Sequence, residues 1–288
     1  MIENILLADS GTGNTRDMMK RLMEIPRLNR SSITILHVVP SQSGSMAMTE
    51  GWEKGGRTLA EAVSELNLDP ARVNAVLREG EPKDLVGKVA NEINADLVVM
   101  GSRGLKGLKA ILGNSVSQYV FQLSERPMLL VKDDLYAIKP IKRILVSIDK
   151  SDVAKESLQV AIDLARDIEK SEIILVHTVP KLSNKLEDAV KENPENDPVL
   201  ADALYKVRRM GISCRCMAPE GKPGDRLCKL IDDLNINLLI VGSPDRRPSI
   251  AKAMPDLDKL LGESLSDYMR VYANCPVLLT RIEAKAGQ

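Results

Sequence analysis

Two stretches of the sequence carry residues that could hold an anionic ligand. Asp9 follows the apolar run 4–8, and the sequence Gly-Ser-Arg-Gly at 101–104 follows a second apolar run, 96–100. Residues 113–116, Gly-Asn-Ser-Val, then open a segment with helical spacing. Glycines let backbone amides approach a phosphate closely, and a helix start adds unpaired N–H groups and a favourable dipole. Either element alone is typical of a tight turn or a helix cap, but the two together predict a phosphate-binding site.

Residues 10–15, Ser-Gly-Thr-Gly-Asn-Thr, are a competing candidate that resembles the phosphate-binding loop of flavodoxins. Hydroxyls, glycines and a following helix could hold the terminal phosphate of FMN there. Flavin sites usually stack the ring on aromatic side chains, whereas this chain has one Trp, five Tyr and one Phe. In the first half, Trp52, Tyr119 and Phe121 are not expected in the loops after the third and fourth strands. A flavodoxin-like FMN-binding protein is therefore the less favoured alternative, and a yellow purified protein would support it.

The chain is an internal duplication. The matching segments are 4–9 with 143–149, 33–40 with 173–180, 96–102 with 237–243, 115–119 with 264–268 and 126–130 with 275–279. The first match places Asp9 opposite Asp149. The offset grows from 141 to 149 between the third and fourth matches, so the second copy has eight additional residues there. Two domains are expected, 1–134 and 141–282, joined by a short charged linker that ends in proline.

Each copy alternates apolar runs with amphipathic segments, which predicts an α/β fold. In the first copy, strands are expected near 3–9, 33–39, 72–78, 96–101 and 127–132, and helices over 15–24, 53–66, 82–93 and 115–123. The strands show little polar alternation, as expected for strands that are buried on both faces. Five such units with right-handed crossovers predict two tandem doubly wound domains, each with a five-stranded parallel sheet and helices on both faces.

The residues quoted above resemble those of the universal stress proteins, and the resemblance extends over nearly the whole chain, twice. It includes the strand that ends in Asp9, the segment 36–39, the sequence Gly-Glu-Pro at 80–82, and the loop that starts at 101. Nucleotide-binding members carry the pattern G-x2-G-x9-G-[ST]. Here Asn114 stands at the third glycine, directly after a glycine, and Asn tolerates a left-handed backbone better than most residues. The resemblance implies the strand order 3-2-1-4-5.

The resemblance also implies an adenine nucleotide, ATP or else ADP or AMP, bound in the first domain with or without Mg2+. Asp9 would lie beside the adenosine or the metal-bound phosphates, and would be the metal ligand. Val38 would meet the adenine through its backbone, and Arg103 with Lys106 would add charge-assisted contacts to phosphate. The full set of implied nucleotide-binding residues is Leu7, Ala8, Asp9, Ser10, Val38, Val39, Gly101, Arg103, Gly104, Gly113, Asn114, Ser115 and Val116.

The second copy departs from this pattern, so we expect its site to be weak or lost. Asp245 replaces the second glycine, and Glu263 stands at the expected helix start. Carboxylates at these places would repel a phosphate, although Arg246 and Arg247 could offset them.

The favoured function is a nucleotide-binding regulator of a stress response. The alternatives are a slow ATPase, for which no base for attacking water is evident, and a dimerisation scaffold without a ligand.

Composition limits the partners and the compartment. Lys plus Arg and Asp plus Glu each total 40, which argues against nucleic acid or an anionic membrane as a partner. No apolar run approaches the ~20 residues that cross a bilayer. The four cysteines are expected to be reduced core thiols of a cytoplasmic protein, and His37 and His177 to be hydrogen-bonded core residues. By analogy with the family, the last strands at 127–132 and 276–281 would pair into an intramolecular pseudo-dimer, with a homodimer also expected.

Overall fold

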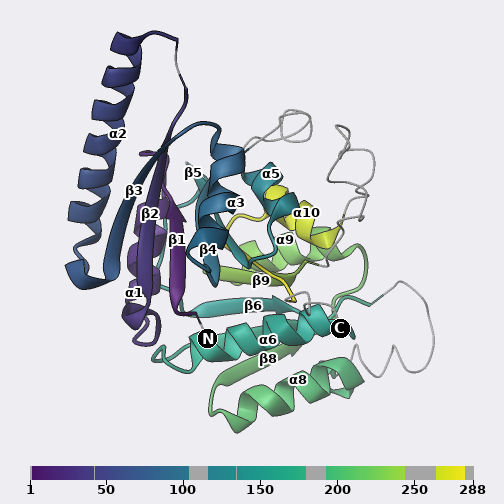
Figure 1. The fold of residues 1–288 in the computed structure, drawn as a ribbon. Coiled ribbons are helices and arrows are strands. Elements are labelled where there is room, and N and C mark those ends of the chain that lie inside the picture. Colours follow the sequence, from purple (N-terminus) through teal and green to yellow (C-terminus); the bar gives the residue numbers. More distant parts are fainter. Residues whose placement is uncertain are drawn as a thin grey trace, which may run out of the picture. The chain divides into compact units, whose positions relative to one another are not determined.

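The chain folds into two compact units, residues 1–138 and 139–288, each of which is an α/β domain (Figure 1). The computed structural model describes residues 2–41, 43–103, 116–133, 135–179, 193–243 and 264–282. The first unit includes the loop 10–15, while most of the loop that follows residue 103 lies outside the described residues.

The first domain is built on a parallel sheet with the order β3-β2-β1-β4-β5. Its strands are β1 (Asn4–Ala8), β2 (Ser32–Val39), β3 (Val73–Glu79), β4 (Leu97–Arg103) and β5 (Met128–Asp133). Because the chain moves from β1 outward to β3 and then returns to β4, the order reverses between β1 and β4. The expected doubly wound topology is confirmed.

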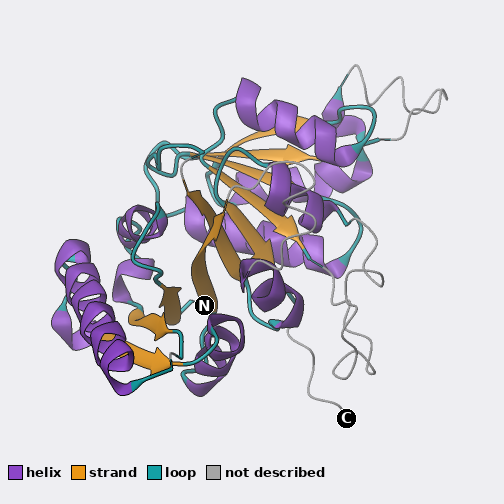
Figure 2. Ribbon diagram, turned by 90° about the horizontal axis from the view of Figure 1, so that it is seen from above, coloured by secondary structure: helices purple, strands orange, loops and turns teal. Residues whose placement is uncertain are grey.

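Helices cover both faces of this sheet, as Figure 2 shows for the strands in orange and the helices in purple. They are α1 (Thr15–Met23), α2 (Ser45–Leu66), α3 (Pro82–Glu92) and α5 (Val116–Leu123), with short 3-10 turns η1 (Leu28–Arg30) and η2 (Pro70–Arg72). Helix α1 packs against α2, and α3 packs against α5. Right-handed crossovers account for this division, because connections that run in opposite directions along a sheet place their helices on opposite faces.

The second domain repeats the topology with the order β10-β9-β6-β7-β8. Its strands are β6 (Arg143–Ser147), β7 (Glu172–Val176), β8 (Ser213–Met217), β9 (Leu238–Gly242) and β10 (Val277–Thr280). The helices are α6 (Asp152–Ala165), α8 (Pro198–Arg209), α9 (Pro223–Asp233) and α10 (Leu265–Tyr272), with the 3-10 turn η3 (Pro194–Asn196).

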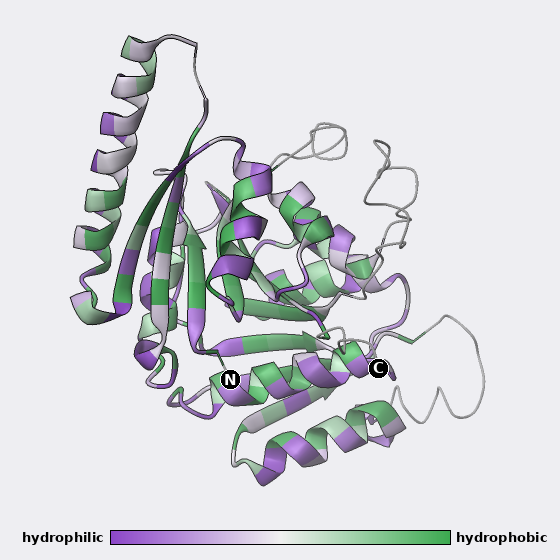
Figure 3. Ribbon diagram, viewed as in Figure 1, coloured by the Kyte–Doolittle hydropathy of each residue, from purple (hydrophilic) through white to green (hydrophobic). Residues whose placement is uncertain are grey.

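The core of each domain lies around its first strand. Ile5, Leu6 and Leu7 of β1 are fully buried, and so are the middle residues of β6. Figure 3 shows the same arrangement, with hydrophobic strands in green and purple hydrophilic patches on the helices. A strand that is covered by helices on both faces cannot alternate polar and apolar side chains, which explains the continuous apolar runs of the sequence.

Helix α2 is longer than the sequence predicted. It begins at Ser45 rather than near residue 53, directly after Gly44, whose φ of 107° is a left-handed conformation that favours glycine. Its first half is largely exposed, with Met46 at 77% and Trp52 at 40% exposure. Because these turns bury little apolar surface, they lack the periodicity from which a helix is predicted.

Candidate functional site

The predicted nucleotide site lies at the carboxyl ends of β1, β2 and β4. Ala8, the last residue of β1, has Leu36 of β2 and Met100 of β4 as its neighbours across the sheet. The ends of parallel strands at a reversal of strand order are where open α/β sheets bind ligands. Three predicted segments lie at this edge of the sheet. They are Leu7 to Ser10, which spans the end of β1, Val38 and Val39 at the end of β2, and Gly101 to Arg103 at the end of β4. Gly104, Lys106, Gly113, Asn114 and Ser115 lie outside the described residues.

Asp9 is buried and engaged in an ion pair. Its side chain is 1% exposed, and Oδ2 accepts hydrogen bonds from Nη2 of Arg16 at 2.7 Å and from Nε at 3.0 Å. Oδ1 accepts a hydrogen bond from the backbone N–H of Gly11 at 3.0 Å. Both carboxylate oxygens therefore have partners, and a metal ion at Asp9 would have to compete with the Arg16 guanidinium.

The ion pair continues into a network that ties α1 to α2. Arg16 also donates to Oε2 of Glu65 at 3.0 Å and to the carbonyl oxygen of Thr58 at 3.2 Å. Burial disfavours the charge on Arg16, but the hydrogen bonds to Asp9 and Glu65 outweigh it and raise the pKa of Arg16. Lys20 and Arg16 lower the pKa of Glu65 through their hydrogen bonds. Sequence reasoning did not single out Arg16, because no motif links it to Asp9.

The flavodoxin-like loop encloses a carboxylate of the protein itself. The backbone N–H of Asn14, which precedes α1, donates to Oδ1 of Asp133 at 3.1 Å, and the Asn14 amide donates to the carbonyl oxygen of Tyr136 at 2.8 Å. Gly13 has a φ of 86°, and a Cβ at this position would overlap the Asp133 carboxylate. A phosphate at the start of α1 would meet this negative charge, which argues against the FMN alternative.

A pair of buried serines fixes the start of α5 beside β4. Ser117, in the first turn of α5, donates to Oγ of Ser102 at 3.4 Å, and both residues are nearly fully buried. The second domain has the same pair, because Ser266 of α10 donates to Ser243 at 3.3 Å. The bond holds Val116, the first residue of α5, near the end of β4 in the first domain. Unpaired N–H groups at a helix start favour an anion.

The second domain has an aliphatic residue where the first has Asp9. The backbone N–H of Asp9 donates to Leu36, and the backbone N–H of Ile148 donates to the equivalent residue of β7. The register of β1 on β2 and of β6 on β7 gives the same correspondence. The alignment of Asp9 with Asp149 was therefore wrong by one residue. Asp149 is exposed, and its carboxylate accepts a hydrogen bond from the backbone N–H of Ser151 at 2.8 Å.

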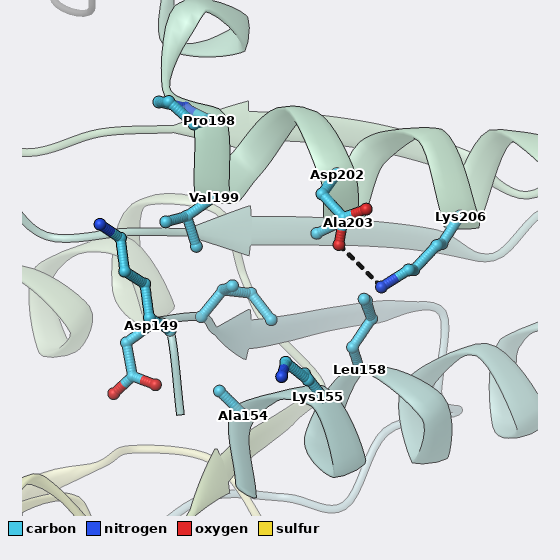
Figure 4. A pocket seen from close by; sticks show the side chains of 11 residues that line it. Asp149, Ala154, Lys155, Leu158, Pro198, Val199, Asp202, Ala203 and Lys206 are labelled. Carbon is cyan, nitrogen blue, oxygen red and sulfur yellow. Dashed lines mark hydrogen bonds and ion pairs between the residues drawn. The ribbon is translucent and has the colours of Figure 1, made fainter. Parts of the chain in front are cut away.

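The second domain has a groove between α6 and α8, with a volume of about 260 Å³. Figure 4 shows apolar side chains between the two helices, together with an ion pair within α8 between Lys206 and Asp202 at 2.7 Å. The lining residues are Ile148, Asp149, Lys150, Ala154, Lys155, Leu158, Pro198, Val199, Asp202, Ala203 and Lys206. The groove is thus apolar at its floor and charged at its rim.

Both histidines are hydrogen-bonded and half-buried. Nδ1 of His37 lies 2.7 Å from the carbonyl oxygen of Asp9, and Nδ1 of His177 lies 2.6 Å from Oδ2 of Asp197. The hydrogen bonds agree with the expected structural role, although neither ring is fully buried. Among the described residues, no three His, Cys, Asp or Glu side chains come together as a metal site.

Two tandem doubly wound domains, each with a reversal of strand order at its first strand, define the chain as a doubly wound α/β protein. The model of the universal stress protein family matches residues 1–132 and 140–281, and the chain belongs to this family. Universal stress protein Sll1654 of Synechocystis is 28% identical over 135 residues, which cover 46% of this chain and 86% of that protein.

Solved structures agree in fold. A universal stress protein from Archaeoglobus fulgidus matches with a TM-score of 0.73 and 22% identity, covering 96% of each chain. A putative universal stress protein from Pseudomonas aeruginosa matches with a TM-score of 0.62 and 13% identity, covering 97% of this chain and 93% of that one. Within the part of the chain that the structure describes, no helix is both long and apolar enough to cross a membrane.

Proposed function

We propose that this chain is a stress-response regulator that binds one adenine nucleotide, ATP or else ADP or AMP, in its first domain. The observation that carries the proposal is the Ser102–Ser117 hydrogen bond, which holds the start of α5 beside the end of β4. The nucleotide phosphates would lie at the start of α5, and the adenine would lie toward Val38 and Val39 at the end of β2. The loop residues Gly104, Gly113, Asn114 and Ser115 would close over the phosphates.

In this proposal Asp9 acts mainly by positioning. Because Arg16 and Gly11 occupy both carboxylate oxygens, Asp9 holds the turn after β1 and the Arg16 side chain in place. Mg2+ would reach Asp9 only if the guanidinium moved onto a phosphate, an exchange that bidentate recognition by Arg allows. If the chain binds the nucleotide tightly only when Mg2+ is present, that result would support such an exchange.

The second domain is proposed to bind the nucleotide weakly or not at all. It has the serine pair, but Ile148 takes the place of the Asp9 carboxylate. Val153 of α6 also lies against Gly242, where a Cβ would come within 2.8 Å of its side chain. At the equivalent Gly101 of the first domain, the nearest side-chain atom to such a Cβ is the Thr15 hydroxyl oxygen at 3.1 Å, so this neighbour is polar in the first domain and aliphatic in the second.

The test is to denature freshly purified protein and to identify the released small molecule by mass, then to measure ATP affinity by calorimetry. Ser117→Ala should weaken binding by about fivefold, since one hydrogen bond that orders the site is worth about 1 kcal/mol. The matched variant Ser266→Ala makes the same change in the second domain and should leave the affinity unchanged. Equal effects of the two variants, or no adenine nucleotide bound at all, would refute the proposal.

The compartment and the assembly follow as further parts of the proposal. The structure places none of the four cysteines in a disulfide, which fits a reducing compartment such as the cytoplasm. We also propose that the last strands of the two domains pair into a pseudo-dimer and that the chain forms homodimers, as expected for the family.

Turnover of ATP well above background, abolished in Asp9→Ala, would favour a slow ATPase over a regulator that only binds the nucleotide.

A further inference from the structure

The second domain has another cavity where its strands begin, which we call the amino-edge cavity. It is formed by the first residues of β6, β7 and β8 and by the residues that lead into β9, and its volume is about 730 Å³. Cavities of about 300–1,000 Å³ are the size that holds small molecules. Open α/β sheets usually bind their ligands at the carboxyl ends of the strands, so this cavity is separate from the site that the fold predicts.

The lining of the amino-edge cavity is strongly basic. Four of its side chains are cationic, namely Lys139, Lys142, Arg143 and Lys170. The lining also contains one carboxylate, Glu172, which accepts hydrogen bonds from Nε and Nη2 of Arg215 at 2.7 and 3.0 Å. Lys170 approaches Glu169 at 3.8 Å, but both side chains are more than 80% exposed, so the pair neutralises little charge. The cavity therefore carries an excess of positive charge.

The first domain carries carboxylates at the corresponding place. There the backbone N–H groups of residues 3 and 4 donate to Oδ2 of Asp96 at 2.7 and 2.9 Å. In the second domain the backbone N–H groups of residues 142 and 143 donate to Oδ1 of Asn237 at 3.1 and 2.9 Å. The carboxylates Glu3 and Asp96 thus have Lys142 and Asn237 as their counterparts. Because the amide makes the same backbone bonds as the carboxylate, the fold does not require this change of charge.

The cavity also holds groups in place for a polar ligand. Nη1 of Arg143 donates to the carbonyl oxygen of Leu234 at 2.8 Å, which anchors the guanidinium through one of its five N–H donors. The hydroxyl of Ser213 and the amide of Asn235 belong to the same lining and can donate to phosphate oxygens. An anchored guanidinium loses less conformational freedom when a ligand binds than a mobile one does.

We propose that the amino-edge cavity binds a small anion that carries two or three linked phosphoryl groups. Phosphate oxygens accept charge-assisted hydrogen bonds from Lys and Arg, and several cations around one cavity favour an anion with several charges. The whole chain has 40 cationic and 40 anionic residues, which favours a small ligand over a nucleic acid or a membrane surface. The proposal rests on no part of the nucleotide site of the first domain.

The first test locates the ligand without a variant. The full chain is acetylated with N-hydroxysuccinimidyl acetate in the presence of inorganic tripolyphosphate, and each lysine is followed by peptide mass. Tripolyphosphate should protect Lys139, Lys142 and Lys170, and inorganic phosphate should need at least a tenfold higher concentration for the same protection. Lys155 of α6, which is 63% exposed and lies outside this cavity, should stay reactive. Because the readout is specific to each lysine, its result is independent of any anion bound in the first domain.

The second test gives the cavity the charges of the first domain. Lys142→Glu and Asn237→Asp each place a carboxylate where the first domain has one, and Asn237→Asp keeps the acceptor for the two backbone bonds. Each should raise the tripolyphosphate concentration that half-protects Lys170 by about tenfold, the effect of one charge-assisted hydrogen bond. Lys206→Glu is the matched control, because it reverses a charge on α8 outside the cavity, and it should leave this concentration unchanged.

Four results would each overturn the proposal. They are no protection of the cavity lysines, equal protection of Lys155, an equal effect of Lys206→Glu and Lys142→Glu, and protection by inorganic phosphate at the same concentration as tripolyphosphate. Stronger protection by a single-stranded RNA or by anionic phospholipid vesicles than by tripolyphosphate would also overturn it, because the basic lining would then serve a macromolecular surface.

Discussion

The two domains share one topology but differ where the first strand ends. In the first domain a buried carboxylate, Asp9, is neutralised by Arg16, which in turn is held by Glu65 of α2. In the second domain the same backbone position is Ile148, which is 6% exposed. Topology thus fixes where strand ends meet, while a shift of one residue decides whether a charge or an aliphatic group lies there.

The two domains also differ in the ion pairs of the helices on one face of the sheet, which are α1 and α2 in the first domain and α6 and α8 in the second. In the first domain, Arg16 and Lys20 of α1 reach Glu65 of α2 and join the two helices. In the second domain, Lys155 pairs with Asp152 within α6 and Lys206 pairs with Asp202 within α8, and a groove lies between the two helices. Ion pairs that join two helices in the first domain thus have counterparts that lie within single helices in the second.

The largest effect expected is from Asp9→Ala. It leaves the guanidinium of Arg16, whose side chain is 12% exposed, without its buried partner, and removal of one member of a buried pair costs about 3–5 kcal/mol. Asp149→Ala is the matched change at an exposed carboxylate and should cost less than about 0.5 kcal/mol. Urea unfolding of the full chain measures both. Similar costs for the two variants would contradict the contrast between the domains.

Gly13→Ala should be the next most damaging change, by about 2–3 kcal/mol, since the new Cβ meets the Asp133 carboxylate and the backbone is left-handed. The control is Gly44→Ala, which has a φ of 107° but no atom within 4 Å of the added Cβ. Gly44→Ala therefore isolates the backbone cost of about 1 kcal/mol. Thermal unfolding of both variants separates the backbone cost from the cost of the contact with Asp133. Equal losses of stability in the two variants would show that Asp133 does not fill the loop.

A smaller, pH-dependent effect is expected at Glu65. Lys20 and Arg16 lower its pKa below the usual 4.5, so its ion pairs stabilise the folded state above that pH and are lost as the pH falls through the lowered pKa. Because Glu65 is 42% exposed, the contribution is at most about 1 kcal/mol. The stability difference between the unchanged chain and Glu65→Gln should be present at pH 7 and decline below pH 4.5. A difference that persists in acid would rule out the ion pairs as its cause.

The smallest effect concerns thiols, which only the second domain contains. Cys216 should react with iodoacetamide several-fold faster than Cys214 at neutral pH, because its lowered pKa gives more thiolate. Cys214→Ala removes the hydrogen-bond donor, so the pKa of Cys216 should rise and its alkylation should slow. Peptide mass spectrometry resolves the two sites. Faster reaction at Cys214 would contradict the lowered pKa of Cys216.

The sheet could be predicted from the sequence because its signal is local. The run Ile5-Leu6-Leu7 needs burial on both faces, and its repetition after residue 143 identifies two equivalent domains. The first half of α2 could not be predicted, because it buries too little to carry a pattern.

The site was less accessible to sequence reasoning, because its contacts join distant segments. The carboxylate of Asp133 reaches the loop 10–15 from 120 residues away, counted from Gly13. Asp9 and Asp149 look equivalent in sequence, but only the pairing of each strand with its neighbour fixes the register, and one residue of shift moves a side chain to the opposite face.

Calorimetric titration of the nucleotide-free full chain with ATP tests the central difference between the domains most directly. One ATP per chain, with an affinity that Ser117→Ala weakens and Ser266→Ala does not, is the predicted result. Two equal sites per chain, or an affinity that responds only to the change in the second domain, would contradict it.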